Sequence, residues 1–286
     1  MPSIFGGIGE PFQNAAAARN SGLEFLVGYR NRDHKFKYSI SANLSTLKNE
    51  VTNFNGQESI NGLTIIREGE AINSFYGYDA IGIFQTDAEV TNHAFQSSST
   101  APGDLIFRDV DESGTIDEKD RVVIGKPLPG VSYGFTLGAE YSNFDFSAFF
   151  QGVTDSNFYA NGWGNDAVKN PRANTITDWL DRWTPDNPST DRIRVVWEDQ
   201  NNQQNSSYWL RDGSYLRLKN IQLGYTLNGD KLNNIGVKSI RFYFSGQNVL
   251  TWAKEDSWDP EQLPSVSNMA QHPQTKVYSF GLNANF

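Results

Sequence analysis

The last thirteen residues of the chain, QTKVYSFGLNANF (274–286), alternate between apolar and polar side chains. The apolar positions are Tyr278, Phe280, Leu282, Ala284 and Phe286. The small or polar positions are Thr275, Ser279, Gly281, Asn283 and Asn285. Successive side chains of an extended strand point to opposite sides, so this period of two predicts a β-strand with one apolar face.

The same alternation recurs along the chain. It is clearest at 131–142 and at 35–45. Further strands are predicted at 23–30, 143–152, 214–227 and 238–250. In 214–227 the apolar positions change phase near Lys219 and Asn220, and one extra residue in the strand, a β-bulge, would cause that change.

Two features distinguish a membrane barrel from a soluble sandwich, whose strands also alternate. The polar faces hold small polar residues and no second apolar set, so the apolar faces are expected to point outward. The connections are also unequal. Short or moderate ones fall at Asn31–Asp33, Ser142–Asn143 and 228–237, and long ones at 49–130, 153–213 and 251–273. Strands of alternating direction place all the long connections on one side, as extracellular loops, so the sequence predicts an all-β fold, an antiparallel transmembrane β-barrel.

Aromatic residues gather where the predicted strands meet the short connections. They are Tyr29, Phe36, Tyr38, Tyr141, Phe144, Phe146, Tyr225 and Phe286. Strands are rich in aromatic residues in general, which is the simpler explanation. Their concentration at the turn ends favours an aromatic girdle at a membrane interface.

Composition and termini narrow the class further. The chain has 286 residues, no Cys and a net charge of −9, which excludes disulfides and zinc–thiolate sites and disfavours a nucleic-acid partner. No apolar run approaches the roughly 18 residues of a membrane-spanning helix. Met1 is followed by PSIFGGIGEPF, which lacks the features of a secretory signal. An outer-membrane protein needs such a signal, so either the class is different or the chain is a fragment or truncated product.

The stretch DVDESGTIDEKD (109–120) has the spacing of an EF-hand-like calcium loop. The candidate ligands at loop positions 1, 3, 5, 7, 9 and 12 are Asp109, Asp111, Ser113, Thr115, Asp117 and Asp120. Gly114 falls at position 6, where the chain must turn sharply. Position 12 is Asp rather than the bidentate Glu, and the flanks resemble strands rather than helices. A solvated turn rich in Asp and Gly is therefore the alternative.

All seven Trp residues lie between Trp163 and Trp258, in or beside the second and third long connections. An exposed Trp ring can stack on a sugar, and the candidate ligand-facing aromatics are Trp163, Trp197, Trp209 and Trp258. Trp179 and Trp183 are expected to pack within the loop, because they share one face of a short predicted helix that ends before Pro185.

No catalytic site is predicted. His34, His93 and His272 are isolated, and no nucleophile elbow, HExxH motif or phosphate loop occurs. Asp and Glu are plentiful, so a carboxylate pair stays open as an alternative, but nothing singles one out.

Seven stretches, taken in order, resemble the SusC/RagA-type TonB-dependent outer-membrane transporters of Bacteroidota. They are NAAAARNSGLEF (14–25), SFYGYDAIGIFQ (74–85), GDLIFRDVDESGTIDEKDRVVIG (103–125), RWTPDNPSTDR (182–192), SYLRLKNIQLGYTL (214–227), FYFSGQNVLTW (242–252) and HPQTKVYSFGLNANF (272–286). They span almost the whole chain, and the terminal Phe286 matches the aromatic C-terminus of such barrels.

The resemblance implies the C-terminal part of a barrel of about 22 strands with a plugged lumen. Such transporters import oligosaccharides or peptides with energy supplied through TonB, and they work with a SusD-like surface lipoprotein. The plug, the TonB-contacting segment and the first strands lie outside the resemblance. About seven strands cannot close such a barrel in lipid, so we expect the chain alone to aggregate.

Two other functions stay open on the residues alone. One is a secreted carbohydrate-binding or structural β-protein with a calcium-braced loop, and the other is a β-rich glycoside hydrolase. The first would be a soluble monomer that binds glycans, and the second would lose turnover on one Asp or Glu change. The outward apolar faces favour the importer.

Overall fold

The computed structural model describes residues 16–160, 177–196, 201–229, 232, 236–255, 259–261 and 274–286. This part of the chain is mostly β-strand, with one short α-helix, α1 (Asp87–Asn92). In the same part, no helix combines the length and the apolar character needed to cross a membrane.

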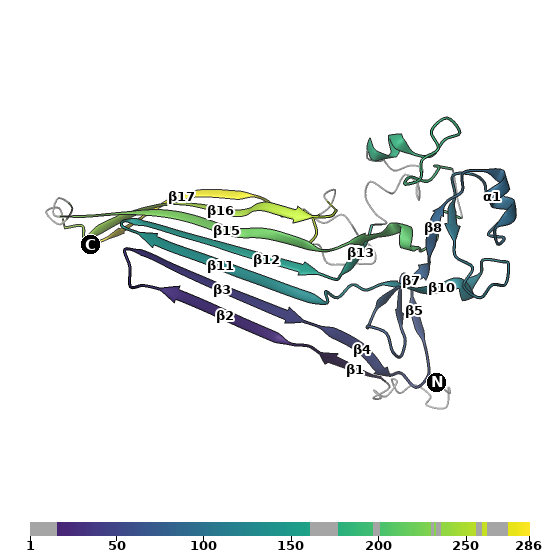
Figure 1. Ribbon diagram of the computed structural model, residues 1–286, viewed down its shortest axis with the longest axis horizontal. Helices are drawn as coiled ribbons and strands as arrows, with labels where there is room; N and C mark the ends of the chain where they lie inside the picture. The colour runs from purple at the N-terminus through teal and green to yellow at the C-terminus, as the bar shows by residue number, and fades with distance from the viewer. Residues whose placement is uncertain are drawn as a thin grey trace, which may run out of the picture.

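The largest element is an antiparallel sheet of seven strands, here called the wall, which crosses most of Figure 1. Its order is β17–β16–β15–β12–β11–β3–β2. The strands are β2 (Glu24–Asn31), β3 (Phe36–Thr46), β11 (Val131–Tyr141), β12 (Phe144–Thr154), β15 (Tyr215–Asn228), β16 (Ser239–Ala253) and β17 (Val277–Asn285). These seven strands confirm the seven that alternation predicts, to within a few residues at each end.

The predicted bulge in β15 is confirmed. Against β12, Leu218 pairs with Phe150 and Asn220 pairs with Phe149, which leaves Lys219 with no residue opposite. Against β16, Leu218 pairs with Leu250 and Asn220 with Gln247, so the register shifts at the same place. The extra residue lets the apolar positions before and after it point to the same side of the wall.

The first hairpin of the wall extends beyond the sheet. β1 (Ala17–Ser21) pairs with β4 (Lys48–Asn53) as a two-stranded ribbon that follows on from β2 and β3. Gly22 joins β1 to β2, and a Cβ at this position would collide with the carbonyl oxygen of Thr46. The close approach of the two backbones therefore requires glycine at residue 22.

The connections sort by length to opposite ends of the wall, as Figure 1 shows. The turn end holds the tight connections, among them the turn at Ser142, which adopts a positive φ of 56°. The loop end receives the long segments 49–130 and 153–213, and the described part of 251–273 begins there. This separation by length agrees with the prediction from strand parity.

The long segments are themselves folded. Together they form a second folded part, here called the loop unit, built on small antiparallel sheets. Its strands are β5 (Ser59–Asn61), β6 (Thr64–Ile66), β7 (Ser74–Tyr78), β8 (Ala80–Ile83), β9 (Leu105–Phe107), β10 (Arg121–Gly125), β13 (Asn157–Tyr159) and β14 (Leu210–Asp212). Its 3₁₀ helices are η1 (Glu118–Asp120), η2 (Thr177–Asp181) and η3 (Ser207–Trp209).

A single hydrophobic core holds the loop unit together across the two long segments. Its buried members are Leu63, Phe75, Tyr78, Ile83, Leu105, Phe107, Tyr159, Trp179, Ile193 and Trp209. The backbones also meet, because the N–H of Tyr78 donates to the carbonyl of Asn205 at 2.8 Å. Strands of three to five residues are stable here because they pack on this shared core.

Candidate functional site

The two faces of the wall differ in character, as the alternation predicts. One face presents large apolar side chains to the surroundings: Phe25, Val27, Tyr29, Phe36, Ile40, Leu44, Tyr141, Phe144, Leu223, Phe242, Leu250, Trp252, Tyr278, Phe280, Leu282 and Phe286. The other face carries mainly Gly, Ser, Thr, Asn and charged residues, with Leu26, Phe149 and Val277 as exposed exceptions. So extensive an exposed apolar surface marks a contact with lipid or with another protein.

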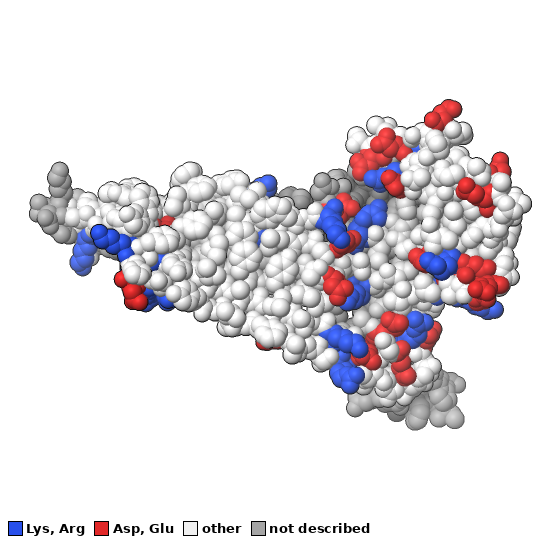
Figure 2. All heavy atoms as spheres, viewed as in Figure 1, with Lys and Arg blue, Asp and Glu red and all other residues white. Residues whose placement is uncertain are grey.

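Charged side chains avoid the middle of the strands. Figure 2 shows them gathered at the turn end and over the loop unit, with almost none between. This distribution leaves a broad uncharged zone across the strands. In a membrane barrel such a zone lies in the hydrocarbon layer, with charges in the aqueous regions on either side.

The aromatic residues of the turn end form a row of ring contacts along the apolar face. The Tyr29 and Tyr38 rings lie 5.8 Å apart, and Phe36 lies 5.9 Å from Tyr38 and 6.5 Å from Tyr141. Farther along, the Phe144 and Tyr225 rings lie 4.7 Å apart. These spacings suit attractive ring packing.

On the polar face, long side chains lie flat across glycines. Arg241 on β16 crosses over Gly224 on β15 to reach Asp145 on β12, with Nε donating to Oδ1 at 2.9 Å. A Cβ at Gly224 would collide with both partners of this ion pair. Glycine therefore clears a path along the wall for a charged pair that spans three strands.

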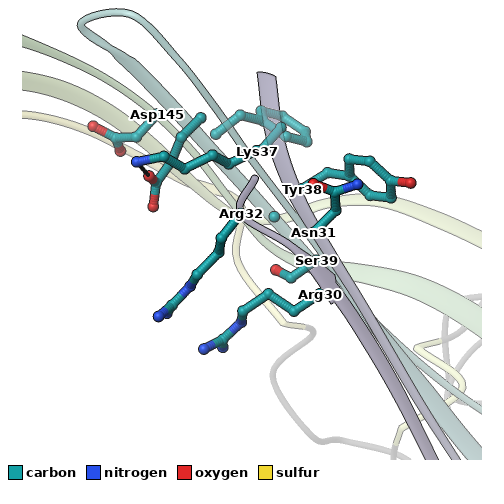
Figure 3. Close-up of a pocket in the computed structure, with 11 residues that line it drawn as sticks. Arg30, Asn31, Arg32, Lys37, Tyr38, Ser39 and Asp145 are labelled. Atoms are coloured by element: carbon teal, nitrogen blue, oxygen red, sulfur yellow. Dashed lines mark hydrogen bonds and ion pairs between the residues drawn. The ribbon is translucent and has the colours of Figure 1, made fainter. Parts of the chain in front are cut away.

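A groove of about 510 Å³ lies on the polar face at the turn end. Figure 3 shows Arg30, Arg32 and Lys37 beside it, with the two guanidinium groups extending in the same direction. The ammonium of Lys37 lies 3.5 Å from Glu140, a weak and exposed pair. The turn end of the polar face is thus rich in positive charge, although the chain as a whole is acidic.

The predicted calcium loop is only partly assembled as a ligand set. The carboxylates of Asp109, Asp111 and Asp120 lie with one oxygen each within 4.8 Å of one another. Gly114 adopts a positive φ of 80°, which confirms the sharp turn expected at this position. The flanks are the strands β9 and β10, as predicted.

The other members of the predicted set have different partners. Asp117 caps the 3₁₀ helix η1 by accepting from the N–H of Lys119 at 2.8 Å. The hydroxyl of Ser113 donates to the Thr115 carbonyl at 2.9 Å. Asp120 is buried and accepts the N–H of Val110 at 2.7 Å and of Asp117 at 2.8 Å. A cation here would bind to a loop whose conformation is already held by its own hydrogen bonds.

The pKa of one carboxyl group in this loop is shifted. The pKa of Asp111 lies below its ordinary value, chiefly because the Ser113 side chain hydrogen-bonds to the charged form. The backbone N–H of Ser113 also donates to this carboxylate, at 3.1 Å. These donors keep Asp111 ionised in moderately acidic solution, which is the form that a hard cation binds.

Trp209 does not face a ligand, which corrects the prediction for this residue. Its side chain is 0% exposed in the core of the loop unit, and its indole N–H donates to the Asn202 carbonyl at 3.2 Å. The sequence indicates only that Trp209 lies in a long connection. It carries no signal that this connection shares a hydrophobic core with a second segment. Trp163, Trp197 and Trp258 lie outside the described residues.

The packing expected for the other two tryptophans of this segment is confirmed. Trp179 is 3% exposed in the core of the loop unit, on the 3₁₀ helix η2. Trp183 packs against the same core, and its indole N–H donates to the Gln85 side chain at 3.1 Å.

Sequence reasoning missed a charged cluster at the loop end of the polar face. Arg217 and Lys219 on β15 contact the acidic residues Asp259 and Glu261, which belong to the third long connection. The alternation of β15 indicates that both cations share the polar face. Nothing in the sequence indicates which acidic residues meet them, because the partners come from a different segment.

Comparisons with known proteins agree with this architecture. The chain is 32% identical over 308 residues to TonB-dependent receptor P3 of Formosa agariphila, and the match covers 99% of this chain and 30% of that protein. It is 26% identical to TonB-dependent receptor SusC of Bacteroides thetaiotaomicron, over 96% of this chain and 27% of SusC. A comparison with protein-family models gives no match.

Solved structures show the same fold. The RagAB peptide importer in its open-open state matches with a TM-score of 0.77 and 23% identity, over 100% of this chain and 30% of that one. Its closed-closed state gives a TM-score of 0.73 and 24% identity.

The chain thus spans about 30% of the length of these curated relatives. Those relatives are receptors rather than enzymes, which confirms the prediction that the chain has no catalytic role. The match covers almost the whole of this chain, and the resemblance of its motifs points to the same group. The chain belongs to the SusC-type TonB-dependent receptors.

Proposed function

We propose that the chain forms part of the barrel wall of a TonB-dependent importer in a bacterial outer membrane. The observation that carries this proposal is the wall itself, whose apolar face is exposed over seven strands while its opposite face is polar. Most of the strands run 9 to 15 residues. Tilted strands of about 9–11 residues are long enough to cross a bilayer.

The orientation follows from the connections. The turn end, with its short connections and aromatic row, faces the periplasm, and the loop unit lies outside the cell. Within the described residues the wall is an open sheet, and β2 and β17 form its two edges. We propose that further strands of a longer protein pair with these edges to close a barrel of about 22 strands around a plug.

The transported substrate is proposed to be an oligosaccharide or a peptide. One relative is the SusC receptor, and the structural neighbour is described as a peptide importer assembled as RagAB. By analogy with these assemblies, a SusD-like surface lipoprotein is the expected partner at the loop unit, and TonB is the expected partner on the periplasmic side.

Fractionation of producing cells tests the proposal for the wall. The longer protein proposed above should sediment with the outer membrane, resist extraction with sodium carbonate and migrate anomalously in gels unless it is boiled. Uptake of a fluorescent oligosaccharide or peptide should stop when TonB is deleted. A protein recovered in the soluble fraction, binding glycans without detergent, would instead support the secreted carbohydrate-binding function.

We also propose a structural calcium ion in the 109–120 loop. Support comes from three converging carboxylates, the turn at Gly114 and the spacing of an EF-hand-like loop. Asp109, Asp111 and Asp120 would bind the ion directly, and the Thr115 carbonyl would be a further oxygen ligand. Such an ion would brace β9 against β10, which adjoin the loop.

A further inference from the structure

Residues 259–261 lie against the polar face of β15, where two cations of that strand contact them. Arg217 Nη2 donates to Asp259 Oδ1 at 2.7 Å, and Lys219 Nζ lies 2.9 Å from Glu261 Oε2. Arg217 Nη1 lies 3.0 Å from the same Glu261 oxygen, as an ion pair without the alignment of a hydrogen bond. These four residues are called the clamp.

The clamp is withdrawn from water. The side chains of Arg217 and Asp259 are 4% and 5% exposed, and that of Glu261 is 13% exposed. Buried charges are tolerated only when they pair with opposite charges. Removal of one partner leaves an unpaired buried charge, which strongly destabilises the folded protein. The clamp is therefore a built contact rather than a chance meeting of surface groups.

The clamp also reaches both ends of the third long connection. Arg217 Nε donates to the Thr251 hydroxyl at 2.8 Å, at the end of β16. The Asp259 carboxylate accepts the backbone N–H of Glu261 at 3.0 Å and of Gln274 at 2.6 Å, shortly before β17. One arginine and one aspartate thus tie the start, middle and end of the connection together.

The bulge in β15 explains how these cations coexist with an apolar outer face. Arg217, just before the bulge, and Lys219, at the bulge itself, occupy odd-numbered positions on the polar face. After it, the odd-numbered Ile221, Leu223 and Tyr225 occupy the apolar face. Without the extra residue, one of the two groups would point to the wrong side.

We propose that Arg217 and Lys219 are positioning residues that dock segment 259–261 on the inner wall. In the importer assigned above, on which this inference rests, the polar face lines the lumen. Residues 259–261 then lie against the inner wall and narrow the outer mouth of the lumen. A passing substrate meets the Asp259–Glu261 segment beside the wall.

Hydrogen exchange of the detergent-solubilised full protein, read by mass spectrometry, tests the docking. Lys219→Met keeps the side-chain length and removes the charge, so peptides containing residues 259–261 and 274 should exchange about tenfold faster. Lys219→Arg should retain protection.

Lys238→Met is the matched control, because Lys238 is an exposed lysine at the opposite end of the wall. It should leave exchange at 259–261 unchanged. If Lys219→Met does not fold, Glu261→Gln replaces it, since the amide keeps the shape and loses the charge. Equal exchange in the charge-removing variant and in Lys238→Met, or loss of protection in Lys219→Arg, would overturn the clamp.

The experiments can reject the docking and the proposed function independently of each other. Exchange protection can be measured whether or not the protein transports anything. Loss of outer-membrane fractionation with an intact exchange pattern would reject the importer and its lumen while the docked segment stands. Normal fractionation with unprotected 259–261 amides would reject only the clamp.

Discussion

Glycine at position 224 leaves the space through which Arg241 reaches Asp145 across three strands. Gly224→Ala should therefore displace this ion pair and destabilise the wall by up to about 1 kcal/mol, because the added Cβ collides with the charged ends of both side chains. The measurement is the urea midpoint of the membrane-inserted protein, followed by loss of heat-modifiable mobility in gels.

Gly28→Ala is the matched control, since this strand glycine has its nearest neighbours at 4.0 Å. Alanine should be neutral or slightly stabilising at position 28, because it restricts the unfolded chain without a collision. Equal midpoints for the two variants would show that Gly224 does not protect the ion pair.

The calcium proposal also belongs to single residues. Calcium should raise the melting temperature of the loop unit, read from the fluorescence of the buried Trp179 and Trp209, and Asp111→Asn should abolish most of that rise. Asp87→Asn, which changes an acidic residue of α1 outside the loop, should keep it. An unchanged melting curve with calcium and with chelator would reject the ion.

The same carboxylate sets the pH range of the effect. The pKa of Asp111 is lowered from its ordinary value of 3.8 by the Ser113 side chain. A lowered pKa keeps the charged form dominant above pH 3.8 and lets protons compete only as the pH falls below that value. The calcium-dependent rise in melting temperature should thus be constant from pH 7 to pH 5. A loss of the effect within that range would indicate a ligand with a higher pKa.

The sequence identifies single-residue features unevenly. Gly114 and the bulge at Lys219 follow from local rules on turns and strand phase, which need no knowledge of distant segments. The burial of Trp209 and the partners of Arg217 depend on other segments folding back, so local patterns carry no signal for them. Asp117 lies at a ligand position of the predicted loop, but its side chain caps a 3₁₀ helix and does not join the three clustered carboxylates.

Within the single strand β17, neighbouring side chains lie on opposite faces of the wall. Phe280 is 86% exposed on the apolar face, and Ser279 lies on the polar face opposite Ser245. Phe280→Lys should lower membrane-insertion yield at a cost of about 2–4 kcal/mol, because a lysine facing lipid near mid-membrane is poorly solvated.

Ser279→Lys, one residue away, should insert almost as well as the unsubstituted protein. Yields of heat-modifiable protein in phospholipid vesicles measure both variants. If Ser279→Lys were the more damaging change, the two faces of the wall would have to be exchanged.

Strand length decides which elements the sequence reveals. The wall strands run at least eight residues, so alternation is repeated often enough to be recognised and to set the register of apolar faces. Strands of the loop unit, such as β6 and β9, have three residues each. A period of two cannot be established over three positions, and their stability comes from a core assembled across segments 49–130 and 153–213.

For the whole molecule, the open wall leaves β2 and β17 with unpaired edges among the described residues. Unpaired backbone groups are strongly disfavoured in lipid and invite association in water. The chain refolded alone is therefore expected to aggregate instead of inserting. Semi-native gel electrophoresis with and without boiling, beside a small closed barrel as control, makes the test. Recovery of an inserted, heat-modifiable monomer would contradict it.

The shared core of the loop unit has a consequence for recombination between relatives. The rings of Phe75 and Tyr159 pack at a tilt with their centroids 6.2 Å apart, although one lies in the first long segment and the other in the second. A chimera that exchanges only one of these segments would join two halves of different cores and leave mismatched cavities. Natural or laboratory shuffling of the outer surface should therefore succeed only when both segments are inherited together, as one cassette.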